Sequence, residues 1–293
     1  MSVFDRHAVR RAFGRAAATY AQAAALQREV ESRLLEQARE LEPRVPARVL
    51  DLGCGPGAAA AALKAAWGRR TTVVAVDLAL PMLRAARAKS RFWRPIHAVQ
   101  ADAQALPFAE ASFDLVFSNL CLQWVADLPA TLGGLRRVLR EEGLLLFSTF
   151  GPGTLVELRE AYAAAGHEPP LSPFASLQQV GDTLLAQGFR DPVVARDRYT
   201  LTYPDTTALM RELQALGATD ARTGRPRGLA GKGRHRAVAA AYEPLRRDGR
   251  LPSSWEVLTA MARAPAPGAP RREGGVDIAR FPADRLPIRR RRG

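Results

Sequence analysis

A glycine-rich turn that carries its own carboxylate offers the clearest chemistry in this sequence. Residues 51–57 read Asp-Leu-Gly-Cys-Gly-Pro-Gly, between an apolar run and an alanine-rich run, which predicts a strand, a turn and a helix. The glycines at positions Gly53, Gly55 and Gly57 let the backbone turn sharply and approach a ligand closely. Asp51, at the start of the turn, favours a ligand with a positively charged end.

Two cofactor classes compete for such a turn. Gly53, Gly55 and Ala58 fit the loose spacing of a dinucleotide-binding turn, and Asp77 follows at the distance expected for an acid that binds ribose hydroxyls. Both nicotinamide dinucleotides and S-adenosylmethionine contain an adenosine ribose, so Asp77 does not separate them. Asp51 favours S-adenosylmethionine, because its carboxylate would repel a pyrophosphate but attract an ammonium or sulfonium group.

The next acidic position suits an adenine ring. Asp102 can accept from the adenine amino group, with the small side chain of Ala103 against the ring, although a turn residue is an equally good explanation of Asp102. Leu78 and Met82 offer apolar contacts to the same ring. Together with Asp51, the glycines and Asp77, these residues predict an S-adenosylmethionine site.

Alternating strands and helices must position these side chains. Five runs rich in Val, Leu and Phe predict strands at 49–51, 71–77, 96–102, 113–118 and 143–149, and helices are expected at 58–67, 80–90 and 128–140. Such alternation predicts an α/β fold whose mostly parallel sheet has helices on both faces. Ligands bind beyond the carboxyl ends of parallel strands, and Asp51, Asp77, Asp102 and Asn119 all occupy such ends, so Asn119 joins the predicted cofactor-binding residues.

The flanking segments are expected to add a lid and inserted helices. Residues 7–42 predict a helix whose face carries Phe13, Tyr20 and Gln27, so residues 1–42 are interpreted as a helical lid. Residues 43–263 form the main domain, with helical insertions at about 154–187 and 205–247. Runs at 192–203 and 255–260 predict two late strands that extend the sheet to seven. Residues 264–293, rich in Pro, Gly and Arg, are expected to form a tail.

Composition limits the function classes. The 293 residues, 47% hydrophobic and 25% charged, indicate a globular chain without a membrane-spanning run or signal peptide, and we expect a cytoplasmic protein. The cysteines, Cys54 and Cys121, make neither a disulfide framework nor a metal site and are expected to pack as small apolar residues. The net charge of +14 favours an acidic partner but does not identify it.

Nucleic-acid methylation finds little support after the fourth strand. The stretch there reads Ser118-Asn119-Leu120-Cys121, without the prolines expected for methylation of a base amino group. Cys121 follows leucine rather than proline, which argues against a nucleophile for pyrimidine carbon. The expected partners therefore include neither nucleic acid nor a membrane.

Residues 45–150 resemble the Rossmann-like class of S-adenosylmethionine-dependent methyltransferases, with residues 51–57 as the first motif and Asp77 as the ribose acid. Residues 4–262 further resemble the malonyl-acyl carrier protein O-methyltransferases of biotin synthesis. That likeness rests on the spacing from Phe13 to Gln27 and on the stretches 77–83, 117–124, 147–155, 200–203, 228–231 and 249–252. It departs at 176–178 and at 141–143, where the family commonly has Asp-Met-His and Pro-Gly-Gly.

The resemblance implies transfer of a methyl group to the free carboxylate of a malonyl thioester, so that the ester can enter fatty-acid elongation and begin pimeloyl formation. The implied partner is malonyl-acyl carrier protein, which is acidic, and the implied product of the cofactor is S-adenosylhomocysteine. Tyr20 and Gln27 would close over the cofactor, Gln123 and Trp124 would border the malonyl group, and Arg225 would hold its carboxylate. The alternatives are a methyltransferase acting on a quinone or a small free acid, and a non-catalytic S-adenosylmethionine-binding protein.

Overall fold

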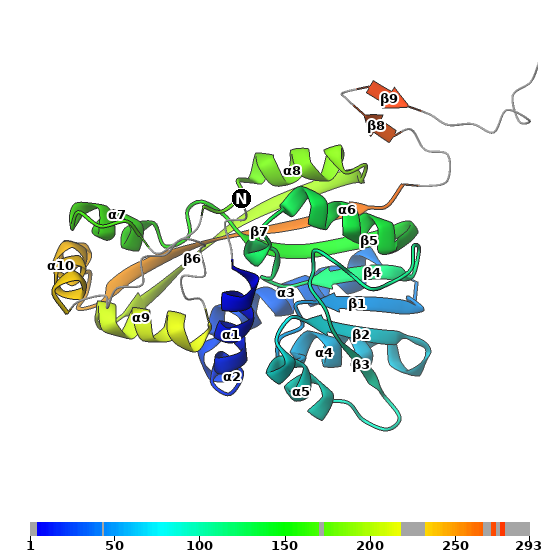
Figure 1. Ribbon diagram of the computed structural model, residues 1–293, viewed down its shortest axis with the longest axis horizontal. Coiled ribbons are helices and arrows are strands. Elements are labelled where there is room, and N and C mark those ends of the chain that lie inside the picture. Colours follow the sequence, from blue (N-terminus) through cyan, green and yellow to red (C-terminus); the bar gives the residue numbers. More distant parts are fainter. Residues whose placement is uncertain are drawn as a thin grey trace, which may run out of the picture.

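A computed structural model describes residues 5–42, 44–169, 173–217, 232–265, 271–273 and 276–278 (Figure 1). Its main feature is a seven-stranded sheet with the order β3-β2-β1-β4-β5-β7-β6, in which β7 is antiparallel to both of its neighbours. The strands are β1 Arg48–Leu52, β2 Thr72–Asp77, β3 Ile96–Gln100, β4 Phe113–Ser118, β5 Leu139–Phe150, β6 Arg190–Tyr203 and β7 Leu251–Arg263. The predicted α/β class and the seven strands are confirmed.

Successive side chains of the central strands point to opposite faces of the sheet, which divides the core into two layers. Val49, Leu115 and Leu144 face one layer, and their neighbours Leu50, Val116 and Leu145 face the other. Helices α3 (Ala25–Leu41), α4 (Ala58–Trp67) and α5 (Leu80–Ala88) cover the first face, whereas α6 (Leu128–Val138) and α8 (Leu177–Ala186) cover the second. Strands that are apolar on both faces require this arrangement, in which a layer of helices covers each face of the sheet.

The inserted helices pack around a third cluster beyond the ends of β5 and β7. The cluster contains the buried aromatic residues Phe150, Tyr162, Tyr242 and Trp255. Helices α7 (Val156–Ala164), α9 (Thr206–Ala215) and α10 (Lys232–Tyr242) supply its walls, and a 3₁₀ turn, Glu243–Leu245, follows α10. In Figure 1 these helices lie at the end of the molecule away from α4 and α5.

The predicted N-terminal helix is broken into three. Helix α1 covers Arg6–Ala16, α2 covers Tyr20–Ala23, and α3 begins at Ala25. Between the first two, the Thr19 hydroxyl donates to the carbonyl oxygens of Ala16 and Ala215, which ties the break to the end of α9. A contact across nearly two hundred residues thus overrides local helix propensity. Helix α3 buries Leu34, Leu35 and Ala38 in the core, while α1 and α2 lie over the strand ends.

Strand β7 ends at Arg263, the last residue of the expected main domain. Ala264 is buried, and its N–H donates to the carbonyl of Gly143, so the sheet contacts continue past residue 263. Two short strands, β8 (Arg271–Glu273) and β9 (Val276–Ile278), pair with each other, and the rest of the predicted tail lies outside the described residues. Across the described ranges, no helix combines the length and apolar character needed to cross a membrane.

Gly57 and Gly134 should respond oppositely to alanine. A Cβ on Gly57, whose φ is +77°, would lie 2.6 Å from the Cβ of Ala86, so Gly57→Ala should lower the free energy of unfolding by about 1–3 kcal/mol. Gly134 is helical with open space around it, so Gly134→Ala should raise that free energy by about 0.5–1 kcal/mol. Urea unfolding measures both, and equal midpoints would contradict the packing assigned to Gly57.

Candidate active site

A cavity of about 780 Å³, open solvent at its mouth included, lies beyond the carboxyl ends of β1, β2, β3 and β4. The sequence predictions place ten of their residues on its wall: Tyr20, Gly53, Gly55, Asp77, Leu78, Met82, Asp102, Ala103, Asn119 and Trp124. Four others, Gln27, Asp51, Gly57 and Gln123, do not line it, and Arg225 lies outside the described residues. The topology therefore gathers most of the predicted set at one edge of the sheet.

The three glycines of the turn serve two different purposes. A Cβ on Gly53 would lie 2.3 Å from the Sγ atom of Cys121, and a Cβ on Gly57 would collide with Ala86 of α5. Both glycines therefore allow the protein to pack against itself. At Gly55 the nearest atom, from Tyr20, would be 3.9 Å away, so this glycine leaves room for a ligand. The sequence analysis expected all three glycines to let the backbone approach a ligand, and only Gly55 has the open space for that purpose.

Asp77 ties the glycine turn to the loop that begins α5. One carboxylate oxygen accepts from the Gly55 N–H at 2.9 Å, and the other accepts from the Ala79 N–H at 2.8 Å. Burial raises the pKa of Asp77 to about 6, although these backbone donors oppose the rise. Each oxygen keeps a lone pair that a ligand hydroxyl can use.

Asp51 is the most buried carboxyl near the cavity. It is 1% exposed, and its Oδ2 atom has no hydrogen-bond partner. Burial, and then the nearby carboxylate of Glu31, raise its pKa well above the usual range. The Oε1 atom of Gln27 is also buried without a partner. Unsatisfied buried acceptors are costly, so this cluster suits a ligand that brings cationic N–H donors.

Glu31 completes this acidic cluster and was missed by the sequence analysis. It follows Gln27 by one helical turn of α3, so the two side chains share a face. Burial raises the pKa of Glu31 to about 7, while Lys89 and Arg28 act in the opposite direction. The spacing from Gln27 was the signal that could have identified it.

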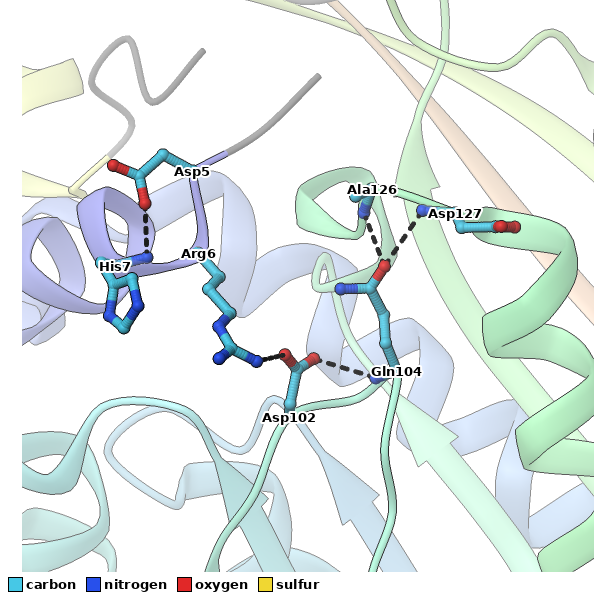
Figure 2. Close-up of polar contacts among 7 residues, drawn as sticks. All are labelled: Asp5, Arg6, His7, Asp102, Gln104, Ala126 and Asp127. Carbon is cyan, nitrogen blue, oxygen red and sulfur yellow. Dashed lines mark hydrogen bonds and ion pairs between the residues drawn. The ribbon is translucent and has the colours of Figure 1, made fainter. Parts of the chain in front are cut away.

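The mouth of the cavity is crossed by a polar contact between the lid and the third strand end (Figure 2). An Arg6 nitrogen lies 3.9 Å from an Asp102 oxygen, and Asp102 also accepts from the Gln104 N–H at 2.9 Å. The amide oxygen of Gln104 in turn accepts from the N–H groups of Ala126 and Asp127. Asp102 is therefore a turn residue that also lines the cavity, and its contact with an adenine amino group stays a prediction.

The wall after β4 is fixed by side-chain amides. Asn119 donates to the carbonyl of Gln27 at 3.0 Å and accepts from the Ser148 hydroxyl at 2.7 Å. Gln123 donates to the carbonyl of Leu120 at 2.7 Å. Its amide is held in the turn outside the cavity lining, so the prediction that Gln123 borders a substrate lacks direct geometric support. Both amides stabilise the loop that carries the wall.

Aromatic and sulfur atoms close the remaining side. The rings of Phe13 and Trp124 meet edge to face with centroids 5.3 Å apart, which joins α1 to the loop after β4. Cys121 lines the cavity, and burial raises the pKa of its thiol to about 12, so the thiol stays protonated at neutral pH. No cluster of three metal-ligating side chains occurs in the part of the chain that the structure describes.

A methyltransferase domain model matches residues 50–147, which include the glycine turn and Asp77. The chain is 51% identical over 290 residues to the malonyl-[acyl-carrier protein] O-methyltransferase of Xylella fastidiosa, covering 99% of this chain and 98% of that protein. It is 47% identical to the protein of the same name from Halorhodospira halophila, covering 98% of this chain and 97% of that one.

Solved structures agree on the fold. The YcgJ protein of Bacillus subtilis superposes with a TM-score of 0.56 at 17% identity, covering 80% of this chain and 99% of that chain. A phosphoethanolamine N-methyltransferase of Haemonchus contortus, solved with S-adenosyl-L-methionine, gives a TM-score of 0.51 at 22% identity and covers 80% of this chain and 52% of that one. These likenesses support the Rossmann-like methyltransferase fold expected from the sequence.

Asp77→Ala should weaken S-adenosylmethionine binding by about tenfold or more, because it removes the ribose acceptor and the link between the two loops. Isothermal titration calorimetry measures the dissociation constant. Asp182→Ala, on the exposed side of α8, is the matched control and should bind normally. Unchanged binding in Asp77→Ala would overturn the assignment of the ribose to this carboxylate.

The affinity for S-adenosylmethionine should fall as the pH falls from 7.2 to about 5.5. Over this range the cofactor amino group stays protonated, while Glu31 and Asp77, with pKa values of about 7 and 6, take up protons and lose their attraction for a cation. Glu31→Gln should remove the part of the dependence near pH 7, and the exposed Glu36→Gln should retain it. A flat dissociation constant in the unmodified protein would contradict the role of this cluster.

Proposed function

The chain belongs to the malonyl-[acyl-carrier protein] O-methyltransferase family, and on this premise we propose that it methylates the free carboxylate of a malonyl group carried as a thioester on acyl carrier protein. The observation that carries the proposal is the extent of the match, which covers the lid and the inserted helices as well as the cofactor domain. The ester formed would begin pimeloyl formation in biotin synthesis.

The residues fit S-adenosylmethionine by charge and shape. We assign the ammonium end to the buried acceptors Asp51 and Gln27, which have oxygens without partners, and the ribose to Asp77. The adenine ring is assigned to the wall made by the following residues: Leu78, Met82, Asp102 and Ala103. Gly53 and Gly55 lie on the cavity wall between these groups, and Asn119 holds the neighbouring loop.

The cofactor supplies an activated methyl group bound to a sulfonium sulfur. An acceptor carboxylate is ionised at neutral pH, so its oxygen forms the new bond to carbon as the bond from carbon to sulfur breaks, and sulfur keeps the electron pair. No proton has to move. The protein therefore needs alignment and exclusion of water rather than a general base, and the neutral Cys121 thiol and the largely apolar wall suit that task.

Tyr20 is the side chain best placed to orient an acceptor. It lines the cavity from α2, and burial followed by the Asp77 carboxylate raises the pKa of its hydroxyl, so it remains a neutral donor. Trp124 lies on the same wall and is proposed to border the malonyl group, with Gln123 supporting the loop beneath it. Arg225 stays a prediction, as does the cytoplasmic location.

Mass spectrometry of malonyl-acyl carrier protein incubated with the enzyme and S-adenosylmethionine tests the proposal. The carrier should gain one CH₂ unit relative to the free acid, and S-adenosylhomocysteine should accumulate in equal amount. Carrier protein without the malonyl group is the control and should not change. Equal turnover of free malonate would overturn the dependence on the carrier, and a lack of transfer to any malonyl thioester would overturn the reaction itself.

A further inference from the structure

One face of the molecule, which we call the α1–α5 face, is made of α1, α5 and the loop that follows α5. Its exposed cations are Arg6, Arg10, Arg11, Arg15, Arg84, Arg87, Lys89, Arg91 and Arg94. Along residues 5–16 and 80–95 the only acidic residue is Asp5. The face therefore carries a large excess of positive charge, which attracts acidic surfaces over distances of about 10 Å at moderate salt.

Little of this charge is neutralised by the protein itself. Arg6 lies 3.9 Å from Asp102, and Arg11 lies 4.0 Å from Asp5. Within the described ranges, no other cation of the face lies within 4.0 Å of a carboxylate, although Lys89 is near enough to Glu31 to act on the pKa of that carboxyl. Both pairs that do form are long, and the arginine side chain in each is mostly exposed, so the arginines remain able to bind another partner.

The opposite edge of the sheet shows that positive charge is not gathered everywhere. On β6 the exposed residues Arg196 and Arg198 flank Asp197, and Arg190 pairs with Glu142 at 3.3 Å. Charges of both signs alternate there. A strongly acidic protein would therefore meet attraction on the α1–α5 face and a mixed surface at β6.

The α1–α5 face borders the candidate active site. Helix α1 contributes Arg6, Val9 and Phe13 to the cavity wall, and α5 contributes Met82. The two helices touch where Gly14 lies against Pro81. Figure 1 shows both helices on the same side of the strand ends. A protein held on this face lies beside the lid over the methyl donor.

Two aromatic side chains supply an apolar contact within the charge. Phe92 is 98% exposed and Trp93 is 58% exposed, at a turn closed by backbone hydrogen bonds between Arg91 and Arg94. Exposed Trp and Phe with flanking arginines are the residue types that interfaces use as anchors. The turn is held in shape before any partner arrives, so little ordering entropy is lost on binding.

We propose that the α1–α5 face docks the acidic carrier protein that presents the malonyl thioester. The inference rests on the proposed function, because that reaction requires the acceptor to arrive on an acidic protein. The face supplies the opposite charge, an apolar anchor and a position beside the cavity. Electrostatic attraction would raise the association rate without changing the chemical step.

Charge reversal on α5 tests this docking surface. Arg84→Glu with Arg87→Glu changes the face without touching the cavity lining, and Arg196→Glu with Arg198→Glu makes the same charge change on β6. The α5 double variant should raise KM for malonyl-acyl carrier protein about tenfold or more, with kcat within about twofold. The β6 double variant should match the unmodified enzyme. The dependence of kcat/KM on salt should also be shallower in the α5 double variant alone.

Two further measurements distinguish a loss of carrier docking from a general disruption of the active site. The dissociation constant for S-adenosylmethionine, and KM for malonyl-pantetheine, which lacks the protein and its charge, should be unchanged in the α5 double variant. Phe92→Ser with Trp93→Ser should weaken binding of the carrier without altering either value. A KM for the carrier that rises equally in the α5 and β6 variants would overturn the docking surface while leaving the proposed function intact.

An outcome with lipid would also overturn the proposal. Vesicles containing anionic phosphatidylglycerol should not sediment the enzyme at physiological salt more strongly than neutral vesicles do. Sedimentation with the anionic vesicles that is lost in the α5 double variant, together with an unchanged KM for the carrier, would assign the face to a membrane instead. Failure of the unmodified enzyme to methylate malonyl-acyl carrier protein would be recognised separately, as failure of the reaction.

Discussion

The carboxylate of Asp77 joins the two loops on which the site depends. It accepts one backbone N–H from the glycine turn and another from the start of α5, so the ends of β1 and β2 are held at a fixed separation. The same two bonds orient the carboxylate, which leaves its remaining lone pairs facing the cavity. Because Asp77 holds the two loops together and is also the proposed ribose acceptor, a substitution there would alter both the loop geometry and the affinity for the cofactor.

A second consequence is an imbalance of charge beneath the turn. Asp51 and Glu31 are buried near Asp77, and Oδ2 of Asp51 lacks a donor. In the free protein these groups are kept partly neutral by protonation, as their raised pKa values indicate. A cationic ligand would supply the positive charge and the N–H donors that these carboxyls lack, and its binding energy would add to the stability of the folded state. A cationic ligand bound at these carboxyls would therefore stabilise the folded state for an electrostatic reason.

Much of this was visible in the sequence because it depends on short-range patterns. The runs of Val, Leu and Phe predicted the sheet, and the positions of Asp51, Asp77 and Asp102 at strand ends placed them at one edge. The break near Thr19 could not be predicted, since it depends on Ala215 of a distant helix. Arg6 was missed for the same reason, because its partner Asp102 comes from another segment of the chain. Glu31 could have been found from its helical spacing to Gln27, although its burial depends on the fold. The reason for Gly53 and Gly57 also emerged only when Cys121 and Ala86 were in place.

The contact between Gly53 and Cys121 has a chemical consequence for the lifetime of the enzyme. It places a sulfur atom in the wall of a cavity that holds a methylating agent, and thiolates are far better nucleophiles toward carbon than carboxylates are. Burial raises the pKa of this thiol to about 12, so the thiol stays protonated at pH 7. Burial near carboxylates therefore keeps the Cys121 thiol in its protonated, poorly nucleophilic form. The acidic surroundings that attract the methyl donor also protect Cys121 from being methylated by it.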